Sequence, residues 1–131
     1  FNHEALANLT QIDYDREMAF IAVRLAPDSH TETDIIGVSR AVSDPNNEEA
    51  EFAVLVRSDL KGQGLGSILL NTIIQYCKQR GLQRLTGITM PNNQGMLSLA
   101  RKSGFQVEIH FEDKTAELLL VLQDDNQPER G

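Results

Sequence analysis

Three glycines at alternate positions, Gly62, Gly64 and Gly66, give this chain its clearest chemical signal. They follow an apolar run, residues 52–56, and stand directly before a helix-like segment that begins at Leu65. Glycines allow a tight turn and leave backbone N–H groups uncovered. The first N–H groups of a helix lack internal partners and lie at the positive end of the helix dipole. The spacing therefore predicts a site for a phosphate-bearing ligand.

The glycine spacing excludes two common phosphate motifs. A P-loop has a lysine directly after its last glycine, whereas Gly66 is followed by Ser67. A dinucleotide fingerprint needs a third glycine three residues after the second. That position holds Ser67 when counted from Gly64 and Leu69 when counted from Gly66. The remaining pattern is Lys61-x-x-Gly64-x-Gly66, which begins with a cation.

The elements that must position this turn alternate between strand and helix patterns. Apolar and β-branched residues predict strands at 17–25, 34–42, 50–56, 83–90, 105–111 and 115–122. Helical spacing predicts helices at 65–80, ended by Gly81, and at 94–103, ended by Gly104. A weaker pattern predicts a short helix at 3–10. This order predicts an α/β (α+β) domain with a mixed, mostly antiparallel sheet, a central β-α-β unit and helices on both faces.

Composition limits the partners that we expect. The chain has 131 residues, a formal net charge of −7 and a sequence pI near 4.8. This acidity disfavours nucleic acid, because phosphate backbones need a basic surface. It suits a cationic substrate such as an amine, although mild acidity also serves solubility alone. No apolar run approaches a membrane span, and a single cysteine, Cys77, allows neither an internal disulfide nor a cysteine-based metal cluster.

The motif that begins at Lys61 resembles the pyrophosphate loop of the GNAT superfamily of N-acetyltransferases, with Lys in place of Arg or Gln. Asn93, before a helix that ends in Gly104-Phe105, matches that superfamily's second signature. Longer segments are similar to the GNAT domain of bacterial protein lysine acetyltransferases, namely QIDYDREMAF, AEFAVLVRSDLKGQGLG, GLQRLTGITMPNNQGM and LARKSGF. There the domain follows an acyl-CoA-synthetase-like region. The resemblance implies that residues 1–131 are a single GNAT domain, the C-terminal fragment of a larger cytoplasmic protein.

The resemblance also implies roles for individual residues. It implies acetyl-CoA as cosubstrate, no metal, and Glu51 as the general base that deprotonates a lysine amine. The two central strands should separate, so that the first pairs with the pantetheine arm and polarises the thioester carbonyl. The cofactor-binding residues expected on this basis are Val54, Leu55, Val56, Lys61, Gly62, Gln63, Gly64, Leu65, Gly66, Ser67 and Asn93. For Asn93, the residue type alone equally favours a helix cap.

Other reactive residues receive no catalytic role. Glu48 and Glu49 follow a loop, where we expect solvation or attraction of a cationic substrate. Many GNAT enzymes have a tyrosine four residues before the Gly-Phe pair that protonates the leaving thiolate. Ala100 holds that position here, so no general acid is assigned. Cys77 lies on the apolar side of its predicted helix, which favours a buried structural residue. The histidines, His3, His30 and His110, share no metal-ligand spacing.

These observations leave three functions open. The first is acetyl-CoA-dependent acetylation of lysine side chains on proteins, including metabolic enzymes such as acyl-CoA synthetases, by direct attack of the neutral amine on the thioester. The second is a non-catalytic module that senses acyl-CoA and regulates its attached region. That module needs the glycine loop but not Glu51. The third is acetylation of small amines, which the same motifs allow.

Overall fold

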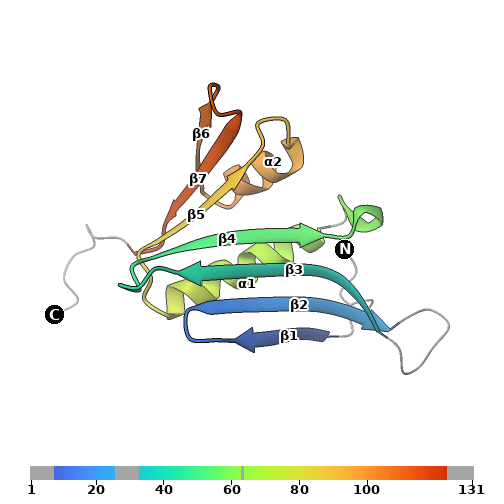
Figure 1. The fold of residues 1–131 in the computed structure, drawn as a ribbon. Coiled ribbons are helices and arrows are strands. Elements are labelled where there is room, and N and C mark those ends of the chain that lie inside the picture. Colours follow the sequence, from blue (N-terminus) through green and yellow to red (C-terminus); the bar gives the residue numbers. More distant parts are fainter. Residues whose placement is uncertain (1–7, 26–32, 63, 124–131) are drawn as a thin grey trace.

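The computed structural model describes residues 8–25, 33–62 and 64–123. They form a seven-stranded sheet in the order β1-β2-β3-β4-β5-β7-β6, with two α-helices (Figure 1). The strands are β1 (Asn8–Asp13), β2 (Glu17–Leu25), β3 (Thr33–Ser43), β4 (Glu49–Val56), β5 (Arg84–Thr89), β6 (Gln106–His110) and β7 (Thr115–Val121). The helices are α1 (Leu65–Gln79) and α2 (Gln94–Lys102), and a short 3₁₀ helix, η2 (Ser58–Leu60), precedes α1. The mixed, mostly antiparallel α+β fold is confirmed.

A parallel pairing of β4 with β5, with α1 as the crossover, forms the centre of the described sheet. The other neighbouring strands pair antiparallel, including the hairpin of β2 and β3. The register of that hairpin shifts between Ala22 and Val23, opposite Gly37. A Cβ on Gly37 would lie 2.7 Å from Leu69 Cδ1 of α1. Gly37 therefore lies at a register shift and at a close approach between β3 and α1, the two usual reasons for a glycine inside a strand.

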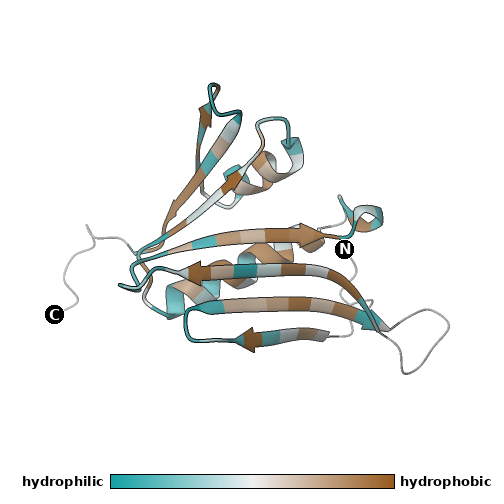
Figure 2. Cartoon of the chain, in the orientation of Figure 1, coloured by the Kyte–Doolittle hydropathy of each residue, from teal (hydrophilic) through white to brown (hydrophobic). Residues whose placement is uncertain are grey.

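Alternation along the strands turns one face of the sheet toward the helices. In β4, Ala50 and Phe52 are buried, whereas Glu51, Ala53 and Leu55 are exposed. Apolar residues dominate the central strands (Figure 2). The buried helical residues in the main core are Leu70, Ile73, Ile74 and Cys77 of α1 and Leu97 and Ala100 of α2. Both described α-helices thus share one core and lie on the same face of the sheet, the face that the strand alternation buries. The sequence analysis expected helices on both faces.

The helix predicted at residues 3–10 is wrong for residues 8–10, and residues 3–7 lie outside the described part of the chain. Residues 8–10 belong to β1, which pairs antiparallel with β2. Leu9 packs against the core and the β-branched Ile12 suits a strand, so pairing with β2 outweighs a weak helical preference. The other predicted elements agree with the structure to within one residue at each end. Among the described helices, none has the length and apolar character to cross a bilayer.

Candidate active site

Strands β4 and β5 pair over a short distance and then separate. Their parallel register ends at Glu51↔Thr86. Beyond it, β4 continues to Val56 and β5 to Thr89 with no further pairing between them in the described residues. Figure 1 shows the two strands diverging from this point. The separation implied by the family resemblance is therefore present, and the main chain of β4 from Phe52 onward has no strand partner on its β5 side.

The glycine loop leads from β4 and η2 into an uncapped helix end. Gly62 and Gly64 have φ angles of +83° and +90°, a conformation that favours glycine. The first helical hydrogen bond of α1 runs from Ile68 N to Gly64 O at 3.2 Å, and no side chain caps the helix. The amides of residues 65–67 precede that bond, so they have no intrahelical acceptor. This is the geometry that binds an anion at a helix N-terminus.

Around the loop, three elements meet. A Cβ on Gly66 would lie 3.5 Å from Leu99 Cδ2 and 3.7 Å from Val56 Cγ2, which are ordinary contacts. The start of α1 is thus packed between the end of β4 and α2. Lys61 is exposed at the head of the loop. Gln63 lies outside the described residues, so its role stays a prediction.

Glu51 lies where the two strands begin to separate, on the face opposite α1. It is exposed and lines a pocket of about 470 Å³, beside Thr86 of β5. Other carboxylates of this pocket are engaged. Glu49 contacts Arg84 Nε at 3.1 Å. Asp44 accepts a hydrogen bond from the Glu48 backbone N–H at 2.9 Å, which holds the pKa of Asp44 below its usual range.

The carboxylate of Glu51 has no hydrogen bond or ion pair to another described residue. It is therefore the acidic group of the pocket that can accept a proton without breaking a structural contact. Of its neighbours, Glu49 uses its carboxylate in the ion pair with Arg84, whereas Glu48 contributes its backbone N–H to the turn and does not line the pocket. The geometry thus separates one candidate base from the carboxylates around it.

Asn93 caps α2 beside the end of β5. Its Oδ1 accepts a hydrogen bond from Met96 N at 3.1 Å, and its Nδ2 donates to Thr89 Oγ1 at 3.0 Å. The helix-capping role suggested by the residue type is confirmed. A contact between Asn93 and pantetheine stays a prediction.

The described tyrosines do not replace the general acid that is missing at Ala100, which is buried in the core. Tyr76 lies on α1, where its hydroxyl accepts a hydrogen bond from Arg80 at 2.7 Å. Its ring packs edge-on against Phe20, with centroids 5.9 Å apart. Tyr14 is exposed in the turn between β1 and β2, and β2 and β3 separate that turn from β4. Neither tyrosine is among the residues that line the pocket of Glu51.

Two other reactive side chains have structural surroundings. Cys77 is buried, and burial raises the pKa of its thiol to about 11, so it stays protonated near neutral pH. His110 Nε2 lies 2.7 Å from Glu117 Oε2 on the hairpin of β6 and β7. Glu108 completes a cluster whose potential ligand atoms lie within 4.8 Å of one another. The sequence analysis did not find this cluster, because only the register Glu108↔Glu117 brings its members together. The contact between His110 and Glu117 is a structural role for the cluster that needs no metal.

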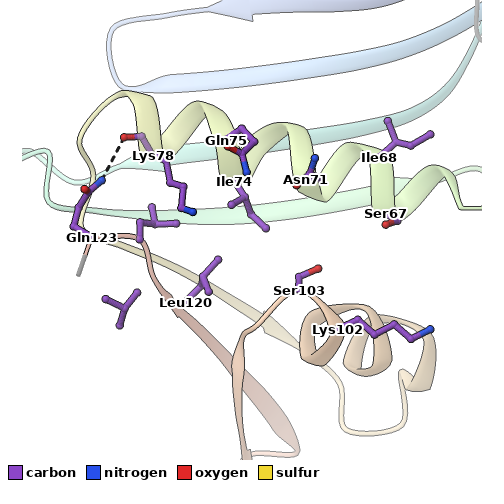
Figure 3. A pocket seen from close by; sticks show the side chains of 12 residues that line it. Ser67, Ile68, Asn71, Ile74, Gln75, Lys78, Lys102, Ser103, Leu120 and Gln123 are labelled. Carbon is purple, nitrogen blue, oxygen red and sulfur yellow. Dashed lines mark hydrogen bonds between the residues drawn. The ribbon is translucent and has the colours of Figure 1, made fainter. Parts of the chain in front are cut away.

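A larger groove of about 1010 Å³ runs along α1 on the helical side (Figure 3). Ser67 lies at one end, next to the glycine loop, and Lys78 at the other, where its carbonyl accepts a hydrogen bond from Gln123 at 3.3 Å. Ser103 and Lys102, at the end of α2, lie on the opposite wall. The charged side chains of the lining are the two lysines. Apart from Ser67, the sequence analysis assigned no role to this lining.

The profile of the Acetyltransferase (GNAT) family matches residues 1–105. The chain belongs to this family. It is 27% identical over 112 residues to Acetyltransferase PA5475 of Pseudomonas aeruginosa, a match that covers 84% of this chain and 58% of that protein. The chain thus spans little more than half the length of this GNAT relative.

Solved structures of GNAT proteins share the fold. The GNAT domain of S. lividans PAT has a TM-score of 0.67 at 24% identity, over 86% of this chain and 65% of that one. The N-acetyltransferase PseH of Campylobacter jejuni, in complex with acetyl coenzyme A, has a TM-score of 0.63 at 22% identity, over 82% and 70%. A spermidine N-acetyltransferase of Vibrio cholerae has a TM-score of 0.69 at 16% identity, over 82% and 66%. These neighbours agree in fold, and one of them is named for spermidine.

Proposed function

We propose that this GNAT domain transfers the acetyl group of acetyl-CoA to lysine side chains of proteins. The observation that carries the proposal is the position of Glu51 at the point where β4 and β5 separate. Beyond that point lie the unpaired main chain of β4, the glycine loop and the open end of α1. A thioester held by these groups would present its carbonyl close to the carboxylate.

Coenzyme A fits the groups on the far side of the strand separation. The amides of residues 64–67, reached through Lys61, Gly62 and Gln63, would bind the pyrophosphate. The main chain of residues 54–56 would pair with pantetheine and donate an N–H to the thioester oxygen. The groove that begins at Ser67 and contains two lysines has the room and the charge for the phosphorylated nucleotide end.

Acetyl transfer then needs a neutral amine. A free lysine has a pKa of about 10.4, so its amine is protonated near neutral pH. Glu51 takes this proton, directly or through water, and the amine attacks the thioester carbonyl. A C–N bond forms, the C–S bond breaks and coenzyme A leaves as a thiolate. The nitrogen, positively charged after attack, loses its second proton, and this proton reaches the thiolate through water.

One feature of the exposed face favours a protein as acceptor. The pocket carboxylates Asp44, Glu49 and Glu51 suit a cationic amine of either kind, a lysine side chain or a small amine. Leu55 on β4, Ile88 on β5 and Met90, the residue after β5, are 69%, 63% and 61% exposed and border the separated strands. Such apolar borders suit contact with a protein surface better than contact with a polyamine. The resemblance to fused bacterial enzymes extends the proposal to a larger cytoplasmic protein with an acyl-CoA-synthetase-like region.

The test compares binding with transfer in Glu51→Gln. Calorimetry should give an unchanged affinity for acetyl-CoA, whereas acetylation of protein lysines should fall by about 100-fold or more. Glu48→Gln is the matched control and should keep full activity, because only its backbone is used. Unchanged turnover in Glu51→Gln would remove Glu51 as the base. Turnover of free polyamines alone would overturn the protein acceptor, and binding without any turnover would indicate a sensing module.

A further inference from the structure

Arg57 connects the stem of the glycine loop to the sheet. Its Nε and Nη2 donate to Asp59 Oδ1 and Oδ2 at 2.7 Å and 2.9 Å, a bidentate contact within the stem. Its Nη1 lies 3.5 Å from Asp34 Oδ2 on β3. One guanidinium group thus joins η2 to the strand beside β4. Bidentate contacts of this kind restrain both position and orientation.

The main chain of Arg57 closes the same stem. Its N–H donates to Ile36 O at 3.0 Å, and its carbonyl accepts from Leu60 N at 2.9 Å. Leu60 is buried and packs in one cluster with Leu65, the first residue of α1. The described loop residues Lys61, Gly62 and Gly64 therefore lie between two fixed points, the stem and the helix.

The charge of Arg57 is already balanced by its neighbours. Its hydrogen bond lowers the pKa of Asp59, which therefore stays ionised at neutral pH. Asp34 is the second carboxylate, and Arg24 lies directly opposite Asp34 in the register of β2 and β3. The cluster contains two cations and two anions. Arg57 is thus placed to hold the loop rather than to bind phosphate.

We propose that Arg57 is a positioning residue for acetyl-CoA, fixing the loop stem so that the amides of residues 64–67 keep their anion-binding arrangement before the cofactor arrives. This inference rests on the proposed function, because it names what fixes the loop of that site. A loop that contains Gly62 and Gly64 has wide backbone freedom, and ordering it on binding would weaken affinity. Lysine cannot reproduce the fork of the guanidinium group. Loss of the contact should therefore raise the KM for acetyl-CoA and leave kcat unchanged.

The experiment measures acetyl-CoA affinity and kinetics in Arg57→Ala, Arg57→Lys and Asp59→Asn. We expect Kd and KM for acetyl-CoA to rise about 2- to 5-fold in each, the range of an exposed ion-pair network, with kcat at saturation unchanged. The double variant that combines Arg57→Ala with Asp59→Asn should add little to either single change, because both remove the same contact. Glu117→Gln, which removes an exposed contact to His110 away from the loop, should leave Kd unchanged.

Equal Kd values for the wild type and folded Arg57→Ala would overturn the inference, and so would a lower kcat at unchanged KM. Circular dichroism establishes folding, and Arg57→Lys, which keeps the charge, provides the test if Arg57→Ala does not fold. A wild-type protein that binds no acetyl-CoA refutes the proposed function. Wild-type binding with unaffected Arg57 variants refutes only the positioning role.

Discussion

The ring of Phe52 occupies the space that a side chain on Gly87 would need. A Cβ on Gly87 would lie 2.5 Å from Phe52 Cε1 and 2.9 Å from Cζ. Phe52 is the first residue of β4 beyond its pairing with β5, and its ring packs against Phe105 with centroids 5.2 Å apart. A core side chain therefore fills the angle between the separating strands. The opening beside Glu51 is thus maintained by packing.

Gly87→Ala should disturb this opening. The added methyl group forces either the Phe52 ring or β5 to move, and overpacking of this kind costs about 1–3 kcal/mol in the free energy of unfolding. Because β5 borders the proposed cofactor cleft, we also expect weaker binding of acetyl-CoA. Urea unfolding measures the first effect and calorimetry the second.

Gly95→Ala in α2 is the matched control. Its new Cβ would have Asn93 Oδ1 at 3.9 Å as its nearest neighbour, an ordinary contact. Alanine is favoured over glycine inside a helix by up to about 1 kcal/mol. This variant should be as stable as the wild type or more so. If Gly87→Ala behaved in the same way, the packing explanation of the opening would be wrong.

The elements around the site were predictable because their signals are local. Glycines with positive φ end both helices, at Gly81 and Gly104, and β4 alternates buried with exposed residues. β1 was not predictable, since it depends on pairing with β2 rather than on its own weak helical pattern. Propensity decides an element only where no neighbouring strand competes for its backbone.

The candidate site likewise contains parts that the sequence predicts and parts that only the fold brings together. The glycine loop was predicted from its motif spacing and Glu51 was assigned through family resemblance, and the cofactor and catalytic roles of both stay predictions. The stem contact of Arg57 could not, because Asp34 is far from it in sequence and meets it only in the folded sheet. The cluster around His110 likewise depends on strand register. Sequence spacing reports neighbours along the chain, whereas these contacts form across strands.

Ser39→Ala should leave stability unchanged or raise it. Ser39 is fully buried, and its Oγ has no hydrogen-bond partner in the described structure. A buried hydroxyl without a partner destabilises the fold by about 1–3 kcal/mol, and alanine removes that penalty. Urea unfolding measures the change, with Asn93→Ala as a contrasting variant that loses its cap and about 1 kcal/mol. A clear loss of stability in Ser39→Ala would show that the hydroxyl is bonded after all.

Cys77 should resist labelling in the folded protein. Its thiol is buried and has a pKa of about 11, so little thiolate exists at pH 8 and reagents have no access to it. A thiol reagent such as dithiobisnitrobenzoate should react at least about 100-fold more slowly with the native chain than with the urea-unfolded chain. Equal rates would contradict the burial of Cys77 on α1.

Stability should depend on pH through His110. The hydrogen bond to Glu117 is the main influence that raises the pKa of His110, and the nearby Glu108 and Asp113 act in the same direction. A raised folded-state pKa stabilises the protein below the unfolded value of about 6.5, and this contribution is lost as pH rises through the folded value.

The comparison of wild type with His110→Gln isolates this contribution. The difference in Tm between them should be largest near pH 6 and shrink toward pH 8, because only the wild type loses the charged contact as the imidazole deprotonates. Glu112→Gln, a change in the exposed turn of the same hairpin, should show no such pH dependence. NMR titration of the imidazole gives the folded pKa directly. A Tm difference that stayed constant from pH 6 to pH 8 would mean that His110 and Glu117 lie side by side without energetic coupling.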